Sequence, residues 1–393
     1  MRTFTFKGLF LTAVFMLLGC SSLYAADDDL ITRQITIKLD KAGTLPDKIG
    51  SSRMYKITNL KLVGEINGTD WKMIREMAGI NYNGYSTEGK LSTLDLSEAK
   101  IVKGGYAYST RYYTSNDEIG DYAFYNCRRL TSLNLPSSIT SIGESAFENC
   151  SGLTSLNLPA GITSIGGRAF ENCSGLTSLN LPAGITSIDY NAFYGCSGLT
   201  SLNLPDGITE IDKYAFYGCS GLTSLTLPAS ITTIGDYAFY GCSGLTSLTI
   251  PDGVTKIGVC TFSNCSYLTS LTIPSSVNFL GGYAFQECTN LQSVYVSWQN
   301  PISAGSAFYG VNIKNCTLYV PQGTEQDYFL ADVWGDFGNI VEFDATGIDK
   351  PTTSTDVEEV SRYSVNGQRL VCPTKGLNIV KYSDGSVKKV VVQ

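Results

Sequence analysis

The sequence predicts a solenoid, which is an elongated stack of β-coil units, with 23 residues in each unit. Residues 119–302 repeat with this period, and residues 142–164 are a representative unit. Within every unit, one position holds cysteine and another holds phenylalanine. A unit this short buries its apolar face only by stacking on its neighbours, so the eight repeats predict eight stacked coils.

Each coil is predicted to contain two short β-segments and one tight helical turn. Leu153, Leu156 and Leu158 alternate with polar residues, which indicates a strand whose leucines point inward. Pro159 ends this strand, because proline lacks the N–H group that a sheet requires. A second β-prone run leads into the turn around Phe170 on the opposite wall. Because the strands of successive coils pair in parallel about 4.8 Å apart, eight coils make a curved rod roughly 40 Å long.

The repeat has the form Ala-Phe-x-x-Cys-x-x-Leu-x-x-Leu-x-Leu-Pro. This form resembles the leucine-rich repeats of the Bacteroides surface-protein-A family, which are also found in treponemes and protozoa. The resemblance covers roughly residues 27–343 and implies a leucine-rich-repeat solenoid. It also implies a cell-surface or secreted binding protein, since members of this family are often adhesins for host matrix proteins.

The repeats occupy only the middle of the chain, and the end coils of a solenoid need caps that cover their apolar faces. We therefore predict six segments. They are a signal peptide at 1–26, an α/β N-terminal capping region at 27–118, eight leucine-rich repeats at 119–302, a degenerate repeat with a C-terminal cap at 303–343, a linker at 344–360 and a small β tail at 361–393.

Both caps are predicted from apolar residues that imitate or cover a coil. In the N-terminal region, the segments ITNLKL and LSTLDL imitate the repeat strand, and a helix is expected between them. Thr69 or Asp70 is the expected N-cap of this helix. Its apolar side chains at helical spacing are Trp71, Ile74 and Met77. The side chains expected to cover the last coil are Tyr328, Trp334, Phe337 and Ile340.

The N-terminus has the pattern of an export signal. Arg2 and Lys7 precede an apolar run at 8–19, which is too short to span a bilayer. Two cleavage sites compete. Leu17-Leu18-Gly19-Cys20 resembles a lipobox, in which Cys20 is lipidated and attaches the chain to the outer membrane. Alternatively, the motif that ends at Ala25 suits ordinary signal peptidase. Both readings predict an exported protein, either at the cell surface or secreted.

The tail resembles the Bacteroidetes C-terminal sorting domain that is associated with type IX secretion. The matching elements are Asn366-Gly367-Gln368-Arg369 and Lys375-Gly376-Leu377-Asn378-Ile379-Val380. A small β-module without a transport role is the alternative. Because a sorting tail usually accompanies ordinary signal cleavage, this resemblance counts against lipidation of Cys20.

The composition excludes most catalytic and nucleic-acid-binding functions. The chain contains no histidine, which removes Ser-His-Asp and Cys-His catalysis and histidine zinc sites. Its net charge of -7 gives no basic footprint for nucleic acid. Asp206, Glu210 and Asp212 are the closest carboxylates in the repeats, and we interpret them as solvated surface. We therefore expect no enzyme activity, no metal, no cofactor and no nucleic-acid partner, and we expect a monomer.

Twelve cysteines in an exported chain usually predict disulfides, but here the spacing favours free thiols. Eight of them occupy the same inward position of successive coils, where parallel side chains keep the sulfur atoms from facing one another. A linear row also lacks the tetrahedral geometry of a zinc site. Cys260 with Cys265 is a minor disulfide candidate. The thiol ladder consists of Cys127, Cys150, Cys173, Cys196, Cys219, Cys242, Cys265 and Cys288.

The first candidate ligand site is a patch of tyrosines on the turn wall. In three consecutive coils, tyrosine follows the repeat phenylalanine directly or precedes it by two residues. Tyrosine is favoured at binding surfaces because its large apolar ring carries a hydroxyl and has few rotors to freeze. The alternative is that these rings only cover the phenylalanine row. The members are Tyr194, Tyr214, Tyr217, Tyr237 and Tyr240.

The second candidate is the polar face of the strands, which recurs as Ser-x-Asn and later as Ser-x-Thr. Such a row can hydrogen-bond a glycan or a peptide, or it simply keeps one face in solution. Its asparagines are Asn134, Asn157, Asn180 and Asn203. The sequence thus predicts binding of a host or neighbouring-cell protein, with polysaccharide capture and a structural stalk without a ligand as the alternatives.

Overall fold

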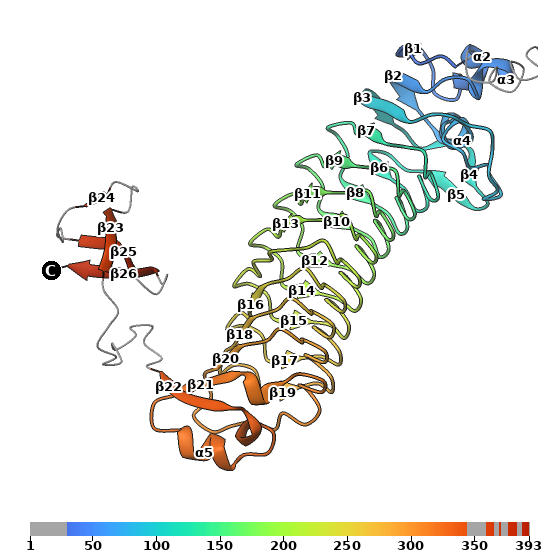
Figure 1. Ribbon diagram of the computed structural model, residues 1–393. Helices are drawn as coiled ribbons and strands as arrows, with labels where there is room; N and C mark the ends of the chain where they lie inside the picture. The colour runs from blue at the N-terminus through green and yellow to red at the C-terminus, as the bar shows by residue number, and fades with distance from the viewer. Residues whose placement is uncertain (1–29, 344–358, 365–368, 371–375, 383–386, 393) are drawn as a thin grey trace, which may run out of the picture. The chain divides into compact units, whose positions relative to one another are not determined.

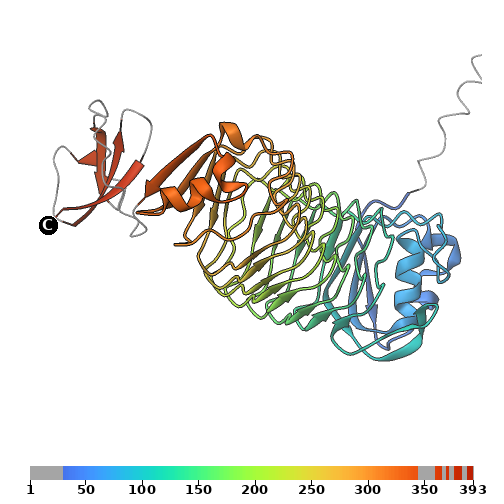
Figure 2. The same cartoon turned by 90° about the horizontal axis from the view of Figure 1, so that it is seen from below.

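The computed structural model describes residues 30–343, 359–364, 369–370, 376–382 and 387–392. It divides into two units, residues 1–342 and 343–393. The first unit is a curved stack of coils (Figure 1), with α4 at one end and the orange C-terminal region at the other (Figure 2). Within the described ranges, every helix is too short or too polar to cross a membrane. The predicted signal peptide with Cys20, residues 344–358 of the linker, and Cys372 lie outside the described residues.

The N-terminal region extends the stack with three parallel strands. β1 (Ile35–Leu39), β2 (Asn59–Ile66) and β3 (Thr93–Ile101) pair in that order, and β3 pairs with the strand of the first coil. The two segments that imitate the repeat strand bury all of their inward side chains, Ile57, Leu60, Leu62, Leu91, Leu94 and Leu96. The remaining elements are α2 (Leu45–Ile49), α3 (Ser51–Met54), α4 (Gly68–Met77), β4 (Gly104–Ser109) and β5 (Tyr112–Thr114).

Helix α4 buries Trp71, Ile74 and Met77, as their spacing predicts. The predicted N-cap was wrong, because Asn67 holds that position and its side chain accepts a hydrogen bond from the Thr69 N–H at 3.0 Å. Asp70 instead lies three residues after the cap, where its carboxylate accepts the Asn67 N–H at 2.9 Å. This reciprocal pair is a capping box, so the acidic residue belongs to the first turn of the helix.

No coil precedes the first repeat, and three side chains of the N-terminal region donate the hydrogen bonds that a preceding coil would donate. Trp71 Nε1 and Arg75 Nη1 each donate to the Ala123 carbonyl at 3.0 Å, and the Tyr108 hydroxyl donates to the Asp121 carbonyl at 2.7 Å. In later coils the equivalent carbonyls accept backbone N–H groups from the preceding coil. The region therefore satisfies carbonyl groups that would otherwise be buried without a partner.

The strand wall is the parallel sheet that the leucine-containing strands form. Its register follows the repeat, so that Leu133 pairs with Leu156. Residues 222–227 contain no strand, and an isolated bridge between Ser201 and Ser224 joins them to the preceding coil. The wall is therefore divided into two sheets at this coil. Its coil strands are β7 (Ser132–Asn134), β9 (Ser155–Asn157), β11 (Ser178–Asn180), β13 (Ser201–Asn203), β16 (Ser247–Thr249), β18 (Ser270–Ile273) and β20 (Ser293–Val296).

A second series of parallel strands, each two residues long, lies after the turn at the repeat proline. It forms two sheets, of three and five strands. Leu153 and Leu156 are buried as predicted, whereas Leu158 is only half-buried, at the point where the chain turns into Pro159. The strands of this series are β6 (Glu118–Ile119), β8 (Ser141–Ile142), β10 (Ser164–Ile165), β12 (Ser187–Ile188), β14 (Glu210–Ile211), β15 (Thr233–Ile234), β17 (Lys256–Ile257) and β19 (Phe279–Leu280).

The turn wall closes each coil with consecutive tight turns whose N–H groups bond to the next coil. Around Phe170, the residues Arg168 and Asn172 have φ values of 59° and 56°, so the segment cannot continue as a helix. The N–H groups of these three residues donate to carbonyl groups of the next coil at 2.6–2.9 Å. The solenoid is thus held together by backbone hydrogen bonds on its turn wall as well as in its sheets.

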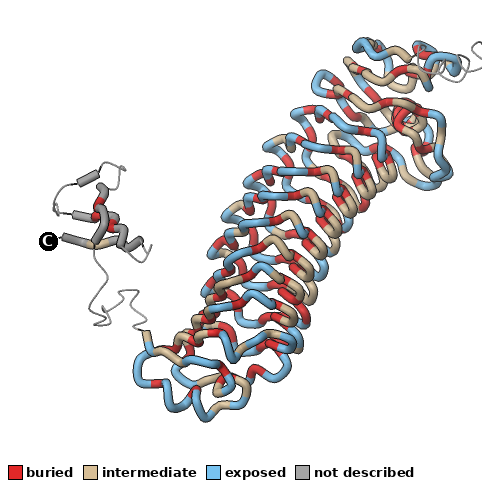
Figure 3. The backbone as a smooth tube through the Cα atoms, in the orientation of Figure 1, coloured by how far each residue is buried: buried red, intermediate tan, exposed pale blue. Residues whose placement is uncertain are grey.

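The repeat phenylalanines form one continuous stack behind the turn wall. Their ring centroids are 5.1–5.8 Å apart and neighbouring rings are tilted by 2–18°. Together with the leucines, they make a single core that runs along the inside of the stack (Figure 3). The stack contains Phe124, Phe147, Phe170, Phe193, Phe216, Phe239, Phe262, Phe285 and Phe308.

All eight cysteines of the thiol ladder are buried and free. From the second coil onward, each thiol donates to the phenylalanine carbonyl of the preceding coil, as Cys150 Sγ does to the Phe124 carbonyl at 3.1 Å. The minor disulfide prediction was wrong. Cys260 and Cys265 are both free thiols, and Cys265 is directed to the Phe239 carbonyl as the other ladder thiols are to theirs.

The C-terminal region continues the strand wall and covers the last coil. Tyr328, Trp334 and Phe337 are buried, Ile340 is half-buried, and the Trp334 ring lies 5.6 Å from Phe308 at the end of the phenylalanine stack. Strands β21 and β22 join the sheet beside β20. The elements are η1 (Ile313–Asn315), β21 (Thr317–Pro321), α5 (Glu325–Leu330), η2 (Trp334–Asp336) and β22 (Asn339–Phe343).

The second unit contains an antiparallel sheet with the strand order β24-β23-β25-β26. Arg362, Asn378 and Val380 are buried in it, and Arg362 Nη1 donates to Asn378 Oδ1 at 3.3 Å. Its strands are β23 (Glu359–Ser364), β24 (Arg369–Leu370), β25 (Gly376–Tyr382) and β26 (Val387–Val392).

The thiol ladder makes the fold sensitive to alkaline pH. Burial raises the pKa of Cys127 to about 11 and the pKa values of Cys196 and Cys288 to about 12. A raised folded-state pKa gives stability that is complete below the unfolded-state pKa, near 9, and is lost as the pH rises above it. Between pH 9 and 11, we expect each buried thiol to remove about 1.4 kcal/mol per pH unit from the free energy of unfolding.

Urea unfolding at pH 7.5 and at several values up to pH 11 measures this loss, with Cys196→Ala as the matched variant. Relative to its own stability at pH 7.5, the variant should decline less steeply than the native chain by the contribution of one thiol. Equal slopes for the two proteins would contradict the assignment of alkaline sensitivity to the ladder.

Candidate binding surfaces

The five predicted tyrosines form one contiguous group, which we call the tyrosine surface. Tyr194, Tyr217 and Tyr240 make one column, in which neighbouring ring centroids are 4.7 Å apart and nearly parallel. Tyr214 and Tyr237 make a second column with a spacing of 5.0 Å. The two columns touch at 6.0 Å, with ring planes tilted by 43–48°. Stacking at the repeat spacing therefore turns five separate positions into one aromatic surface.

The local backbone explains how these rings are presented. Tyr214 and Tyr237 both have a φ of 58°, a left-handed conformation that bulky residues rarely adopt. Their N–H groups donate to the next coil, at 3.2 Å and 2.9 Å, which holds this conformation. In the other column, each tyrosine is followed by a left-handed glycine, Gly195, Gly218 or Gly241. Four of the tyrosines are half-buried beside the wall, and the fifth, Tyr214, is exposed at 36%.

The tyrosine surface is neutral and is bordered by polar groups. Burial, together with the neighbouring Tyr240 and Tyr194, raises the pKa of Tyr217, and a hydrogen bond with Cys260 raises the pKa of Tyr237. Both hydroxyls are therefore protonated at neutral pH and can donate hydrogen bonds. In the coils before Tyr194, the equivalent positions hold Glu148 and Glu171. The surface thus ends at an acidic border.

The second predicted surface, the polar face of the strand wall, is also assembled as a row. Asn134, Asn157, Asn180 and Asn203 are all exposed and lie in register on successive strands. Two hollows interrupt this face beside the coil that lacks a strand. A hollow of about 180 Å³ includes Asn180, Asn203 and Thr226, and one of about 470 Å³ includes Thr226 and Thr249.

These hollows are not predicted by the repeat pattern of the sequence. The only signal at this place is the change from Asn203 to Thr226 at equivalent positions of consecutive repeats. The hollows have serine, asparagine and threonine at their sides, with leucines such as Leu202 and Leu225 in the lining. The lining thus offers neutral hydrogen-bonding groups over an apolar floor, and the larger hollow also includes the carboxylate of Asp252.

The structure brings no metal site together in the described part of the chain, where no cluster of three or more Cys, Asp or Glu side chains could hold an ion. Asp206 and Glu210 are exposed and Asp212 is half-buried. Burial raises the pKa of Glu171, with the nearby Glu148 as a further cause, yet Arg168 Nε lies 3.6 Å from it and forms an ordinary surface ion pair.

The repeat pattern of the chain matches a known family. Residues 117–227 and 209–325 match the BspA type leucine rich repeat region, in six copies. Together the matches span residues 117–325, which are 209 of the 393 residues. The chain belongs to the BspA type leucine-rich repeat family. Membership confirms both the predicted solenoid class and the resemblance that was based on the repeat motif.

Several solved structures are similar to this BspA-type chain. The T. pallidum leucine rich repeat protein is 28% identical, with a TM-score of 0.33, over 45% of this chain and 72% of that one. A leucine rich cell surface protein from Faecalibacterium prausnitzii is 24% identical, with a TM-score of 0.34, over 61% and 86%. A leucine-rich repeat protein from Bacteroides ovatus is 21% identical, with a TM-score of 0.42, over 81% and 97%. No curated protein matches the chain.

Stacking within the tyrosine surface should stabilise the fold measurably. Tyr217 lies between Tyr194 and Tyr240 at 4.7 Å from each and also touches Tyr214 at 6.0 Å, so Tyr217→Ala removes three ring contacts. The two stacked pairs alone are worth about 0.5–1.5 kcal/mol each. We expect Tyr217→Ala to lower the free energy of unfolding by about 2 kcal/mol and Tyr217→Phe by less than about 0.5 kcal/mol in urea titrations.

The control is Tyr267→Ala. Tyr267 is 62% exposed and has no ring contact among the described residues, so its loss should change the stability by about 0.5 kcal/mol at most. If Tyr217→Ala costs no more than this control, the rings of the tyrosine surface do not stabilise one another.

Proposed function

We propose that this BspA-type protein is exported and binds a protein of a host or neighbouring cell through the tyrosine surface. The observation that supports this most directly is the arrangement of five partly exposed tyrosines as two touching columns on three consecutive coils. Leucine-rich-repeat families of this kind act by binding or as structural parts, and we propose no catalytic role.

The chemistry of the tyrosine surface suits a protein partner. Aromatic rings are enriched in the centres of protein interfaces, where they bury apolar area and retain a polar group for hydrogen bonding. The rings are already fixed by stacking, so little side-chain entropy is lost on binding. Charged residues such as Glu171 and Asp236 lie at the border, which matches the polar rim of an interface.

We propose that export uses the predicted signal at residues 1–26 and the tail at 361–393. The tail resembles a type IX sorting domain, and β23 to β26 supply a compact antiparallel sheet that suits a recognisable module. Lipidation at Cys20 is the competing means of attachment to the outer membrane. The mass of the mature N-terminal peptide distinguishes a lipidated Cys20 from a chain that begins after Ala25.

A second candidate function is capture of a neutral polysaccharide on the strand wall. The hollows beside residues 222–227 support it, because their serine, asparagine and threonine side chains suit sugar hydroxyls. Asn180 and Asn203 would contact such a ligand.

Binding of the purified chain to a panel of host matrix proteins and neutral glycans tests both functions. We expect saturable binding of a protein ligand, weakened at least 30-fold in a Tyr217→Ala and Tyr240→Ala double variant, because interface hot spots typically contribute about 2 kcal/mol or more. A Tyr106→Ala and Tyr267→Ala variant is the matched control, since both side chains are exposed and lie outside the tyrosine surface.

Other outcomes separate the alternatives. Binding of a glycan that is lost in an Asn180→Ala and Asn203→Ala variant, but retained when the tyrosines are replaced, would favour the strand wall. If the Tyr217→Ala and Tyr240→Ala double variant binds the protein ligand as tightly as the control variant does, the tyrosine surface is not the binding site. Absence of any ligand for a well-folded chain would favour a structural stalk.

A further inference from the structure

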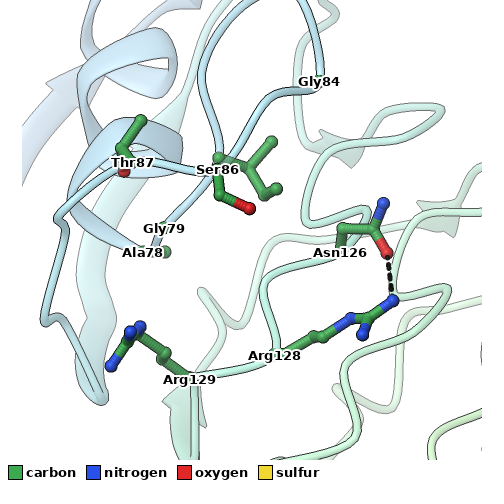
Figure 4. Close-up of a pocket in the computed structure, with 9 residues that line it drawn as sticks. Ala78, Gly79, Gly84, Ser86, Thr87, Asn126, Arg128 and Arg129 are labelled. Atoms are coloured by element: carbon green, nitrogen blue, oxygen red, sulfur yellow. Dashed lines mark hydrogen bonds between the residues drawn. The ribbon is translucent and has the colours of Figure 1, made fainter.

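A pocket of about 470 Å³ lies between the N-terminal region and the first coil (Figure 4). Gly79 and Ser86, from the segment that follows α4, line one side of it. The other side is lined by Asn126, Arg128 and Arg129, which belong to the turn of the first coil. Figure 4 shows the two arginine side chains extending in opposite directions, Arg129 towards Gly79 and Arg128 towards Asn126. This pocket is separate from the tyrosine surface and from the hollows of the strand wall.

The Arg128-Arg129 pair departs from the repeat, because no other coil has a charged residue at either of these two positions. The five coils that follow have Ser-Gly at these two positions, and the last two have Ser266-Tyr267 and Thr289-Asn290. A Cβ at Gly152 would lie 2.4 Å from the Arg128 carbonyl oxygen, and one at Gly198 would lie 2.3 Å from the Ser174 carbonyl oxygen, so the Ser-Gly coils are packed too closely for a side chain at the second position. The first coil has no such coil before it. The N-terminal region takes that place and leaves room for long side chains and for a pocket.

The arginines have no carboxylate partner within the described residues, where neither is part of an ion pair. No acidic residue lines the pocket. The C-terminal carbonyls of α4 do not need the guanidinium groups either. Those of residues 74–77 already accept hydrogen bonds from the N–H groups of Ala78, Ile80, Gly79 and Leu91. In a chain with a net charge of -7, this is a local concentration of uncompensated positive charge.

We infer that this pocket binds an acidic sugar, through a uronate carboxylate or a sugar sulfate. Guanidinium groups bind such oxyanions with paired N–H donors. Asn126, whose side-chain oxygen faces Arg128 at 3.5 Å, and Ser86 offer neutral partners for ring hydroxyls. Tyr85 lies in sequence between the lining residues Gly84 and Ser86 and is 71% exposed. The volume is within the range of small-ligand sites, about 300–1,000 Å³.

Calorimetry with the full chain tests the proposal at about 0.15 M ionic strength, where long-range attraction is screened. The probes are an oligogalacturonate, a heparin-derived hexasaccharide, a neutral oligosaccharide of equal length and a polyglutamate peptide. We expect one or both acidic oligosaccharides to bind, and Arg128→Ser with Arg129→Gly, which restores the residues of the repeat, to weaken binding at least tenfold. Preference for the uronate or for the sulfate identifies the anion.

The matched control is Arg33→Ser with Lys41→Ser, which removes two exposed positive charges away from the pocket and should change the affinity less than twofold. If the first variant melts at a lower temperature, Arg128→Gln with Arg129→Gln retains the side-chain length and is expected to give the same loss. The tyrosine double variant should still bind the acidic sugar, which separates this site from the proposed protein-binding function.

Three results would overturn the inference. They are no binding of either acidic oligosaccharide, an equal loss of affinity in the charge control, and tighter binding of polyglutamate than of both sugars with the same dependence on Arg128 and Arg129. The last result would assign the pocket to an acidic peptide.

Discussion

Each coil depends on the hydrogen bonds that its turn makes to the next coil. The N–H group of a repeat phenylalanine donates to the carbonyl of the residue that precedes the next repeat phenylalanine, and this bond fixes neighbouring coils at the spacing that the phenylalanine rings share, 5.1–5.8 Å. At that spacing a side chain always meets its own equivalent. Rings that stack and thiols that donate to a carbonyl tolerate such a neighbour, and glycine, which has no side chain, lets a carbonyl approach closely. The repeat is built largely from these residues.

The same constraint explains why the ends of the stack differ from its middle. At the N-terminal end, Trp71, Arg75 and Tyr108 supply the donors that a preceding coil would supply. At the other end, Trp334 packs on Phe308. These caps are needed to satisfy the core and the backbone, but they do not reproduce the surface of a coil. The arginine pocket lies at such a boundary, where a long side chain at the position of the repeat glycine meets the N-terminal region and not another coil.

Much of the solenoid could be predicted because stacking converts sequence spacing into contact. Positions 23 residues apart meet, so the phenylalanine stack, the thiol ladder and the columns of tyrosine and asparagine followed from the repeat alone. Features that depend on contacts between unlike segments could not be predicted in this way. The Asn67 cap depends on the direction of a side chain, the half-burial of Leu158 on the path of one turn, and the hollows on a missing strand at 222–227. The pocket requires the loop after α4 and the first coil to be placed together, which no period encodes.

The tyrosine surface has a further consequence for how such a protein changes over generations. Because each coil presents the same donors and acceptors to both of its neighbours, removal or duplication of a 23-residue unit leaves every remaining junction intact. Recombination between nearly identical gene segments can therefore lengthen or shorten an aromatic column by one ring at a time without redesigning the core. The area of the aromatic surface can therefore change by one inherited repeat at a time, while the packing that stabilises each junction stays the same.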